Sequence, residues 1–187
     1  MSERFEIRET TLPGVYLLER RPRTDERGWL ERMYCADELA GVLGARAIVQ
    51  VNRTLTRRRT TVRGMHLQVN PSAEAKIVSC LRGEIFDVAV DVRRESPTFL
   101  GWHAEVLSAE NRRSLFVPEG FAHGFQAVVD DSEILYFSTA AYDPPAERGI
   151  HPLDPRVAIA WPLPVEHLSA RDASHPLLGP EFDGFLA

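Results

Sequence analysis

The chain has 187 residues, 44% of them hydrophobic and 26% charged. This balance is typical of a globular protein, and we expect one domain over residues 1–187. The formal net charge of −5 argues against a nucleic-acid-binding surface. No apolar run approaches the roughly 18 residues of a membrane span, and residues 1–10 lack an apolar signal sequence, so we expect a cytoplasmic protein with no membrane partner.

Short runs rich in β-branched and aromatic residues recur along the chain and are separated by turn residues. Nine of them predict strands, at 14–19, 47–54, 61–69, 76–81, 84–92, 102–107, 114–117, 125–129 and 133–139. Only two short helices are predicted, one at 36–43 and one starting at Ser169. Many strands at this spacing favour an all-β protein, either a sandwich or a barrel.

The strand predicted at 61–69 carries two unusual polar residues, Arg63 and His66. Strict alternation would place them on opposite faces of the sheet. Gly64 lies between them, and a β-bulge is easily formed at a glycine. We therefore expect a bulge that brings Arg63 and His66 to the same side.

Residues 76–92 predict a hairpin with its turn at 81–84. In the second strand, Asp87 lies between apolar residues on a segment that is apolar on both faces, and a buried carboxylate needs a partner. In the first strand Lys76, the only lysine of the chain, shares a face with Val78 and Cys80. Its amine either points into these packed surroundings or, because Lys76 begins the strand, extends into solvent.

Two later positions add further polar groups to apolar strands. His123 follows a turn shaped by Pro118 and Gly120, and Tyr136 lies within the apolar run 133–137. Each alone has a structural explanation, as a hydrogen-bonded core histidine or as a tyrosine that anchors a barrel rim.

Together, the two histidine-bearing segments resemble the arrangement of the cupins. Where metal-binding cupins usually have two histidines, this chain has His66-Leu67-Gln68, and an amide is a poor ligand for the metals that histidine clusters select. We therefore expect neither a metal nor another cofactor. A metal-dependent cupin oxygenase that uses His66, Glu74 and His123 remains an alternative.

A longer series of motifs resembles one family over nearly the whole chain, the dTDP-4-dehydrorhamnose 3,5-epimerases. The matching segments are 11–15, 25–28, 50–52, 62–66, 83–91, 96–99, 107–111, 117–125, 147–150, 154–155 with 161–162, and 168–172. The resemblance implies a cupin-type double-stranded β-barrel, a homodimer, and a dTDP-linked 4-keto-6-deoxy sugar as the substrate. It implies an epimerase that inverts C3, C5 or both.

The resemblance also implies a role for particular residues. His66 matches the general base, and Asp172 matches the carboxylate that orients it. Lys76 matches the cation that stabilises the enolate. Tyr136 matches the acid on the opposite face of the sugar. His123 and Asp87 match a supporting pair. The positions that match substrate or nucleotide contacts are Arg27, Gln50, Asn52, Arg63, Tyr142 and Glu147.

The chain departs from the family pattern at a few positions. They are Arg32, Leu67, Phe137 and Ala141. The residues matched to catalysis are all present, which favours an enzyme over the remaining alternative, a barrel that binds a sugar nucleotide without turning it over.

Overall fold

The structure is a computed structural model that describes residues 4–186. Residues 1–3 of the charged N-terminal segment, and Ala187, therefore lie outside the described residues.

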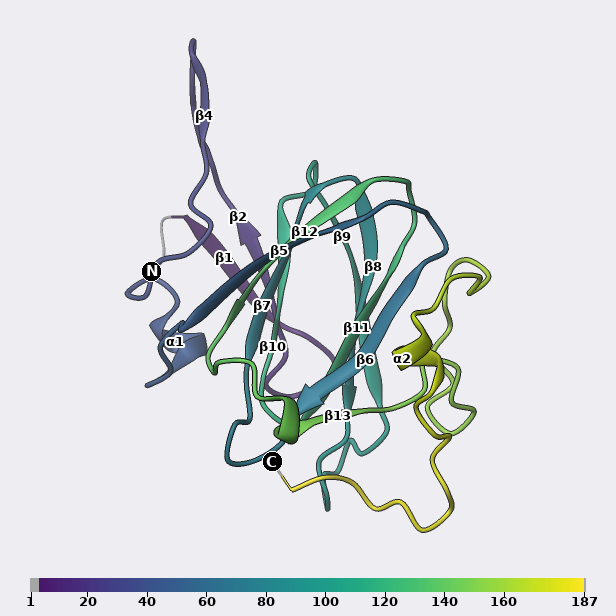
Figure 1. Ribbon diagram of the computed structural model, residues 1–187. Helices are drawn as coiled ribbons and strands as arrows, with labels where there is room; N and C mark the ends of the chain where they lie inside the picture. Colours follow the sequence, from purple (N-terminus) through teal and green to yellow (C-terminus); the bar gives the residue numbers. More distant parts are fainter. Residues whose placement is uncertain (1–3, 187) are drawn as a thin grey trace.

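Two antiparallel β-sheets face each other and form the body of the protein (Figure 1). One sheet has six strands in the order β1-β2-β10-β7-β12-β5, the other has five in the order β13-β6-β11-β8-β9, and β3 and β4 form a separate hairpin. The strand bounds are β1 Phe5–Glu9, β2 Tyr16–Arg20, β3 Arg23–Asp25, β4 Gly28–Leu30, β5 Gln50–Thr56, β6 Val62–Gln68, β7 Lys76–Arg82, β8 Glu84–Asp91, β9 Trp102–Ser108, β10 Arg113–Val117, β11 Phe121–Ala127, β12 Ser132–Ser138 and β13 Glu147–Gly149. This arrangement confirms the predicted double-stranded β-barrel.

The helices are short. They are α1 at Ala40–Leu43, the 3₁₀-helix η1 at Pro144–Ala146, and α2 at Ala170–Ala173. Across residues 4–186, no helix reaches the length and hydropathy that a bilayer crossing requires. The helix predicted from Ser169 is confirmed, with Ser169 as its N-cap. The prediction of a helix over 36–43 was wrong at its start, because residues 36–39 form turns.

All nine predicted strands are present, with ends displaced by a few residues. The largest displacement is in β11, which begins at Phe121 rather than at residue 125 and so includes His123. The sequence patterns missed β1, β3, β4 and β13. Three of these have only three residues, and β3 and β4 are exposed along their whole length, so they show no apolar alternation.

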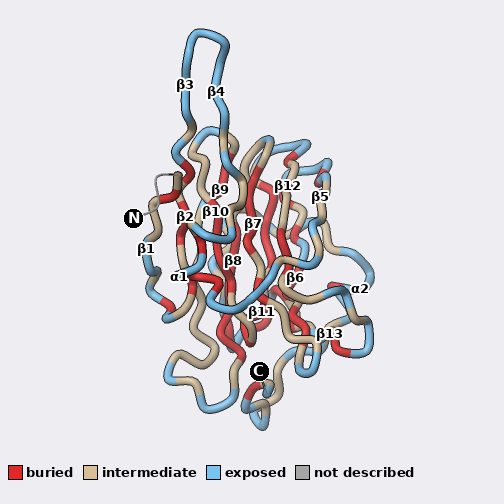
Figure 2. The backbone as a smooth tube through the Cα atoms, turned by 90° about the vertical axis from the view of Figure 1, so that its left-hand side faces the viewer, coloured by how far each residue is buried: buried red, intermediate tan, exposed pale blue. Residues whose placement is uncertain are grey.

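The apolar core lies between the two sheets. It joins residues of β7 and β10 in one sheet to residues of β8, β9 and β11 in the other, with Val78 and Leu115 facing Ile85, Leu107 and Phe125. The buried segments therefore run along the inside of the barrel, while the β3–β4 hairpin projects from it and is exposed (Figure 2).

The outer faces of both sheets are also covered. The segment around α1 packs on the six-stranded sheet, and the C-terminal segment packs on the five-stranded sheet. Trp161 of the C-terminal segment meets Phe86 of β8 edge to face, with ring centroids 6.1 Å apart. β8 is thus buried on both faces, as its sequence predicts, and Asp87 lies on its inner face with no solvent exposure.

The β-bulge predicted at Gly64 is present. His66 pairs with His123 and Arg63 pairs with Phe125, so three residue steps on β6 match two on β11. Gly64 has a φ of +141°, and a Cβ built there would lie 2.6 Å from the Cα of Gly124. The bulge places Arg63 and His66 on the wall of the same cavity.

Gly64→Ala should destabilise the fold by roughly 2–4 kcal/mol, because the new Cβ meets backbone atoms and the positive φ disfavours an L-residue. Gly41→Ala is the matched control: Gly41 lies in α1, where a Cβ would meet nothing within 4 Å. It should be neutral or stabilising by up to about 1 kcal/mol. Urea unfolding of the two variants checks both values, and equal stabilities would contradict the role given to Gly64.

Candidate active site

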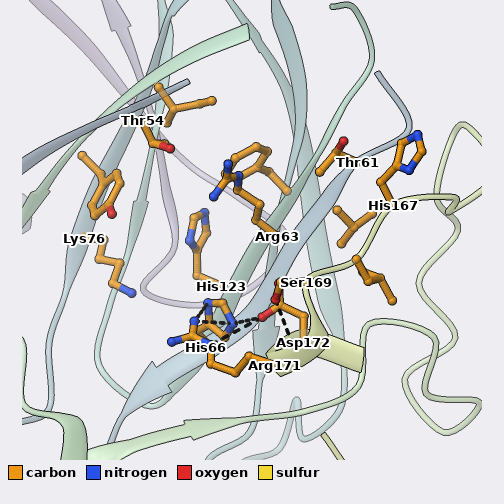
Figure 3. Close-up of a pocket in the computed structure, with 15 residues that line it drawn as sticks. Thr54, Thr61, Arg63, His66, Lys76, His123, His167, Ser169, Arg171 and Asp172 are labelled. Carbon is orange, nitrogen blue, oxygen red and sulfur yellow. Dashed lines mark hydrogen bonds and ion pairs between the residues drawn. The ribbon is translucent and has the colours of Figure 1, made fainter. Parts of the chain in front are cut away.

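A cavity of about 640 Å³ opens between the two sheets and is also lined by residues of the segment 167–172. Figure 3 shows Arg63, His66, Lys76 and His123 around this shared space, with Asp172 beside His66. Tyr136 also lines it. A second hollow of about 340 Å³ shares His66, Lys76 and Tyr136 with the first. It is also lined by four residues predicted to contact the substrate or nucleotide, namely Gln50, Asn52, Tyr142 and Glu147.

The His66–Asp172 pair joins β6 to α2. The Oγ of Ser169 accepts a hydrogen bond from the backbone N–H of Asp172 at 3.0 Å, which caps the helix and turns the Asp172 carboxylate toward β6. Oδ1 of Asp172 lies 2.7 Å from Nε2 of His66, and the Gly64 N–H points to Oδ2 at 3.5 Å. Since an ionised carboxylate only accepts, it favours a proton on Nε2 and leaves the lone pair of a neutral imidazole on Nδ1.

The environment of Asp172 keeps its carboxylate ionised. Burial by itself would raise the pKa of Asp172, but the hydrogen bonds and charge of His66, with the Gly64 N–H, outweigh burial and lower that pKa. An ionised Asp172 fixes the orientation and tautomer of His66.

A second His–Asp pair lies deeper in the barrel. Nε2 of His123 on β11 is 2.8 Å from Oδ1 of Asp87 on the neighbouring strand β8. His123 is therefore the partner that the buried Asp87 carboxylate requires. The other oxygen, Oδ2, has no hydrogen-bond partner among the residues that the structure describes.

Lys76 and Tyr136 lie on the opposite wall, because β7 and β12 belong to the six-stranded sheet and β6 to the other. The Lys76 amine forms an ion pair with Glu74 at 2.9 Å, and its side chain is only 15% exposed. The interpretation that this amine points into solvent was therefore wrong. Burial raises the pKa of Tyr136, the charge of Glu74 adds to this and Arg63 opposes it, so the phenol is protonated at neutral pH.

A chain of polar contacts borders the second hollow. The Arg171 guanidinium lies 3.0 Å from Nε2 of His66 and donates to Oε2 of Glu147 at 3.1 Å. The Tyr142 hydroxyl donates to the same oxygen at 3.0 Å, which raises the Tyr142 pKa. The Tyr142 N–H donates to Oε1 of Gln50 at 3.0 Å. Arg171 was not among the residues predicted from the sequence, although its position next to Asp172 could have indicated it.

Arg27 is not brought to this site within the chain. It lies at the end of the projecting β3–β4 hairpin (Figure 2), where it pairs with Asp25 at 2.6 Å and its side chain is 84% exposed. Arg63 does reach the cavity, and its Nε donates to Oγ1 of Thr56 at 3.0 Å.

The structure does not support the alternative metal set of His66, Glu74 and His123. Among residues 4–186, the group of His, Cys, Asp or Glu donors that converge within 4.8 Å is instead His66, Asp172 and His175. His175, which the sequence analysis also missed, follows α2. Burial lowers the His175 pKa, and the nearby charge of His66 lowers it further.

The departures from the family pattern lie mostly away from the His66–Asp172 pair. Phe137 stacks on Tyr34 outside the barrel, with centroids 5.7 Å apart. Arg32 pairs with Glu38 on the surface. Leu67 is buried under the C-terminal segment and borders the second hollow.

Known proteins share the sequence pattern and the fold of this chain. A sequence model of the dTDP-4-dehydrorhamnose 3,5-epimerase family matches residues 9–179. The chain is 42% identical over 172 residues to the dTDP-4-dehydrorhamnose 3,5-epimerase of Salmonella typhimurium, covering 91% of this chain and 93% of the relative. It is 38% identical over 181 residues to a dTDP-4-dehydrorhamnose 3-epimerase of Streptomyces niveus, covering 96% and 87%.

A solved structure is equally similar. The 3,5-epimerase of Legionella pneumophila, in complex with dTDP-4-keto-L-rhamnose, superposes with a TM-score of 0.86 at 38% identity, and the match covers 91% of each chain.

Asp172→Asn should lower the free energy of unfolding at pH 7 by about 1.5–3 kcal/mol, the range of a hydrogen bond to a charged group. Because the folded-state pKa of Asp172 is depressed, its contribution is present above the unfolded pKa and is lost as the pH falls through the folded pKa. The difference from the unmodified protein should therefore shrink toward acid pH. Urea unfolding between pH 7 and pH 3 measures it, with the exposed Asp37→Asn as a control that shows no such difference.

Proposed function

The chain belongs to the dTDP-4-dehydrorhamnose 3,5-epimerase family of isomerases, and from that premise we propose that it inverts C3, C5 or both in a dTDP-linked 4-keto-6-deoxy hexose during deoxysugar biosynthesis. The observation that carries the proposal is the placement of two kinds of proton-transfer group on opposite walls of one cavity. The His66–Asp172 pair lies on one wall, and Tyr136 lies with Lys76 on the other.

His66 is the proposed general base. The 4-ketone of the sugar acidifies the hydrogens on the adjacent carbons, and an imidazole has a pKa suited to removing one of them near neutral pH. The lone pair on Nδ1 accepts the proton. Asp172 holds Nε2 and stabilises the imidazolium that forms.

Lys76 is the proposed enolate-stabilising residue. Removal of the proton moves the C–H electron pair into the C–C bond and negative charge onto the ketone oxygen. The Lys76 ammonium, which is largely buried and held by Glu74, offers a positive charge in a water-poor site. The ketone accepts the electrons and Lys76 offsets the charge, so this route needs neither a metal nor a cofactor.

Tyr136 is the proposed acid that completes the inversion. A carbon is inverted only when the new proton arrives on the face opposite to the one that lost it. Tyr136 is half-buried, and its raised pKa keeps the phenol protonated until the enolate takes the proton. His123 and Asp87 support the same wall of the cavity as His66 from behind.

The remaining predicted residues are the proposed substrate contacts. Arg63 at the cavity suits a diphosphate, because a guanidinium binds phosphate oxygens through two hydrogen bonds. The second hollow, with Gln50, Asn52, Tyr142 and Glu147, offers amide, phenol and carboxylate groups to the rest of the nucleotide sugar.

We further propose that residues 1–187 act as one domain within a homodimer. The β3–β4 hairpin presents Arg27 with two exposed apolar side chains, Trp29 and Leu30. β5 is an edge strand with Val51 exposed. A second copy that covers these surfaces would bury them and could receive Arg27 at its own cavity, which lacks that residue in the single chain.

The assignment of the two proton-transfer residues is testable with a dTDP-4-keto-6-deoxy sugar in heavy water. His66→Asn should abolish both deuterium exchange and inversion. Tyr136→Phe should retain exchange but return mostly the starting stereoisomer, with inversion reduced on the order of a hundred- to ten-thousand-fold. Mass spectrometry measures exchange, and NMR of the sugar identifies the carbon and its configuration.

Tyr16→Phe is a matched control, because Tyr16 packs on Phe116 outside the barrel. It should behave as the unmodified enzyme does. Near-normal inversion by Tyr136→Phe would reject that residue as the acid, and normal exchange by His66→Asn would reject the mechanism.

The dimer proposal predicts that two defective chains restore activity when they are mixed. Arg27→Ala lacks the hairpin cation and His66→Asn lacks the base, but a mixed dimer contains one complete site. Random association would recover about one quarter of the unmodified activity at low substrate concentration. Sedimentation at micromolar concentration should show a dimer for both variants. A monomer, or a mixture no more active than its parts, would contradict the proposal.

A further inference from the structure

His175 lies beside the His66–Asp172 pair. Its ring meets that of His66 edge to face, with centroids 5.8 Å apart. Its Nε2 is buried and has no hydrogen-bond partner among the described residues. A buried polar atom of this kind calls for a ligand, because leaving it unpaired costs free energy.

The backbone makes room for this ring at Gly149. A Cβ built on Gly149 would lie 2.3 Å from Nε2 of His175, so only a glycine admits the imidazole in this position. Gly149 is also the cross-strand partner of His66 on β13. The second imidazole is thus held against β13, the strand that pairs with the one carrying the proposed base.

The donors of His66, Asp172 and His175 lie within 4.8 Å of one another. Two imidazoles and one carboxylate, with a fourth position open, are a common ligand set for Zn²⁺ and related transition metals. Bond lengths of 2.0–2.1 Å place tetrahedral donors roughly 3.4 Å apart. Small side-chain rotations would therefore bring the three donors onto one ion.

We propose that His66, Asp172 and His175 bind one divalent transition metal ion such as Zn²⁺, and that this ion reversibly inhibits the enzyme. The ion enters between Nε2 of His66 and Asp172, and the proton on Nε2 moves to Nδ1 through solvent. Nδ1 then has no lone pair for the proton of the substrate. The metal site stands on the geometry alone, and only the inhibition rests on the proposed function.

The charges around the site determine the affinity that we expect for the metal ion. The Arg171 guanidinium, 3.0 Å from Nε2 of His66, opposes a second positive charge. Its own partner Glu147 offsets this at 3.1 Å, and the Arg171 side chain is half exposed, so it is free to turn away. We therefore expect a dissociation constant in the micromolar range rather than that of a structural zinc site.

The first experiment measures metal binding directly, on protein without a histidine tag. Calorimetry with Zn²⁺ should give one site per chain, Co²⁺ should produce the visible spectrum of a tetrahedral site, and Mg²⁺ should not bind. His175→Gln keeps a polar side chain but removes the imidazole, and should weaken Zn²⁺ binding about a hundredfold, since loss of a supporting contact alone costs 10–100-fold.

Two further variants separate binding from packing. Gly149→Ala leaves all three donors in the chain but displaces His175, and should weaken binding as His175→Gln does. His151→Gln is the matched control, because His151 accepts a hydrogen bond from the Leu153 N–H and is not in the donor group. It should bind as the unmodified protein does. If Gly149→Ala does not fold, the comparison of Zn²⁺ affinity between His175→Gln and His151→Gln still tests the metal site.

The second experiment measures inhibition. Zn²⁺ should inhibit the unmodified enzyme reversibly, with full recovery on adding a chelator, and His175→Gln should need at least about tenfold more Zn²⁺ relative to its own metal-free rate. The metal site is overturned if Zn²⁺ does not bind, or binds His175→Gln as tightly as the unmodified chain. Binding without inhibition overturns the inhibitory role. Absence of epimerisation in metal-free enzyme would reject the proposed function and leave the binding result standing.

Discussion

A charge enclosed between two apolar sheets must be met by a partner, and this constraint organises the cavity end of the barrel. Asp87 is fully buried and Asp172 is only 3% exposed, so water can do little to solvate their carboxylates. Asp87 meets His123, Asp172 meets His66, and Lys76 meets Glu74, each at 2.7–2.9 Å. The two His–Asp pairs also tie separate parts of the chain together, because Asp172 lies on α2 and Asp87 lies on β8, next to the strand of its histidine partner.

The same constraint explains how the two walls of the cavity differ. The His66 wall is held by carboxylates on a helix and on a neighbouring strand. On the other wall, burial is the largest influence on the Tyr136 phenol, and the charge of Glu74 adds to it, so the neutral form is favoured although Arg63 opposes this. A proposed base kept in one tautomer and a proposed acid kept protonated suit a reaction with two opposed proton transfers. The closure of two sheets into a barrel brings these walls face to face.

Much of this could be predicted from the sequence, because alternation reports which face of a strand is buried. The patterns predicted the nine long strands, the burial of Asp87 and the bulge at Gly64. They did not predict where the Lys76 amine points, because its partner Glu74 lies just outside the strand, where side-chain alternation gives no information. His175 and Arg171 were missed for a related reason: only the docking of α2 and the following loop against β6 and β13 brings them to the site. The contact between α2 and β6 is tertiary, and no local pattern encodes it.

Lys76 is the only lysine in the chain, and its position in the cavity gives it a use as a reporter. Reductive methylation with isotopically labelled formaldehyde modifies primary amines alone, so apart from the α-amino group it would label a single atom of the protein, the Lys76 nitrogen. The resonance of that label would follow the ionisation of one cavity group against a background free of other lysine signals. In most proteins, amine labelling gives overlapping signals from many surface lysines, whereas here the lysine signal would come from the cavity alone.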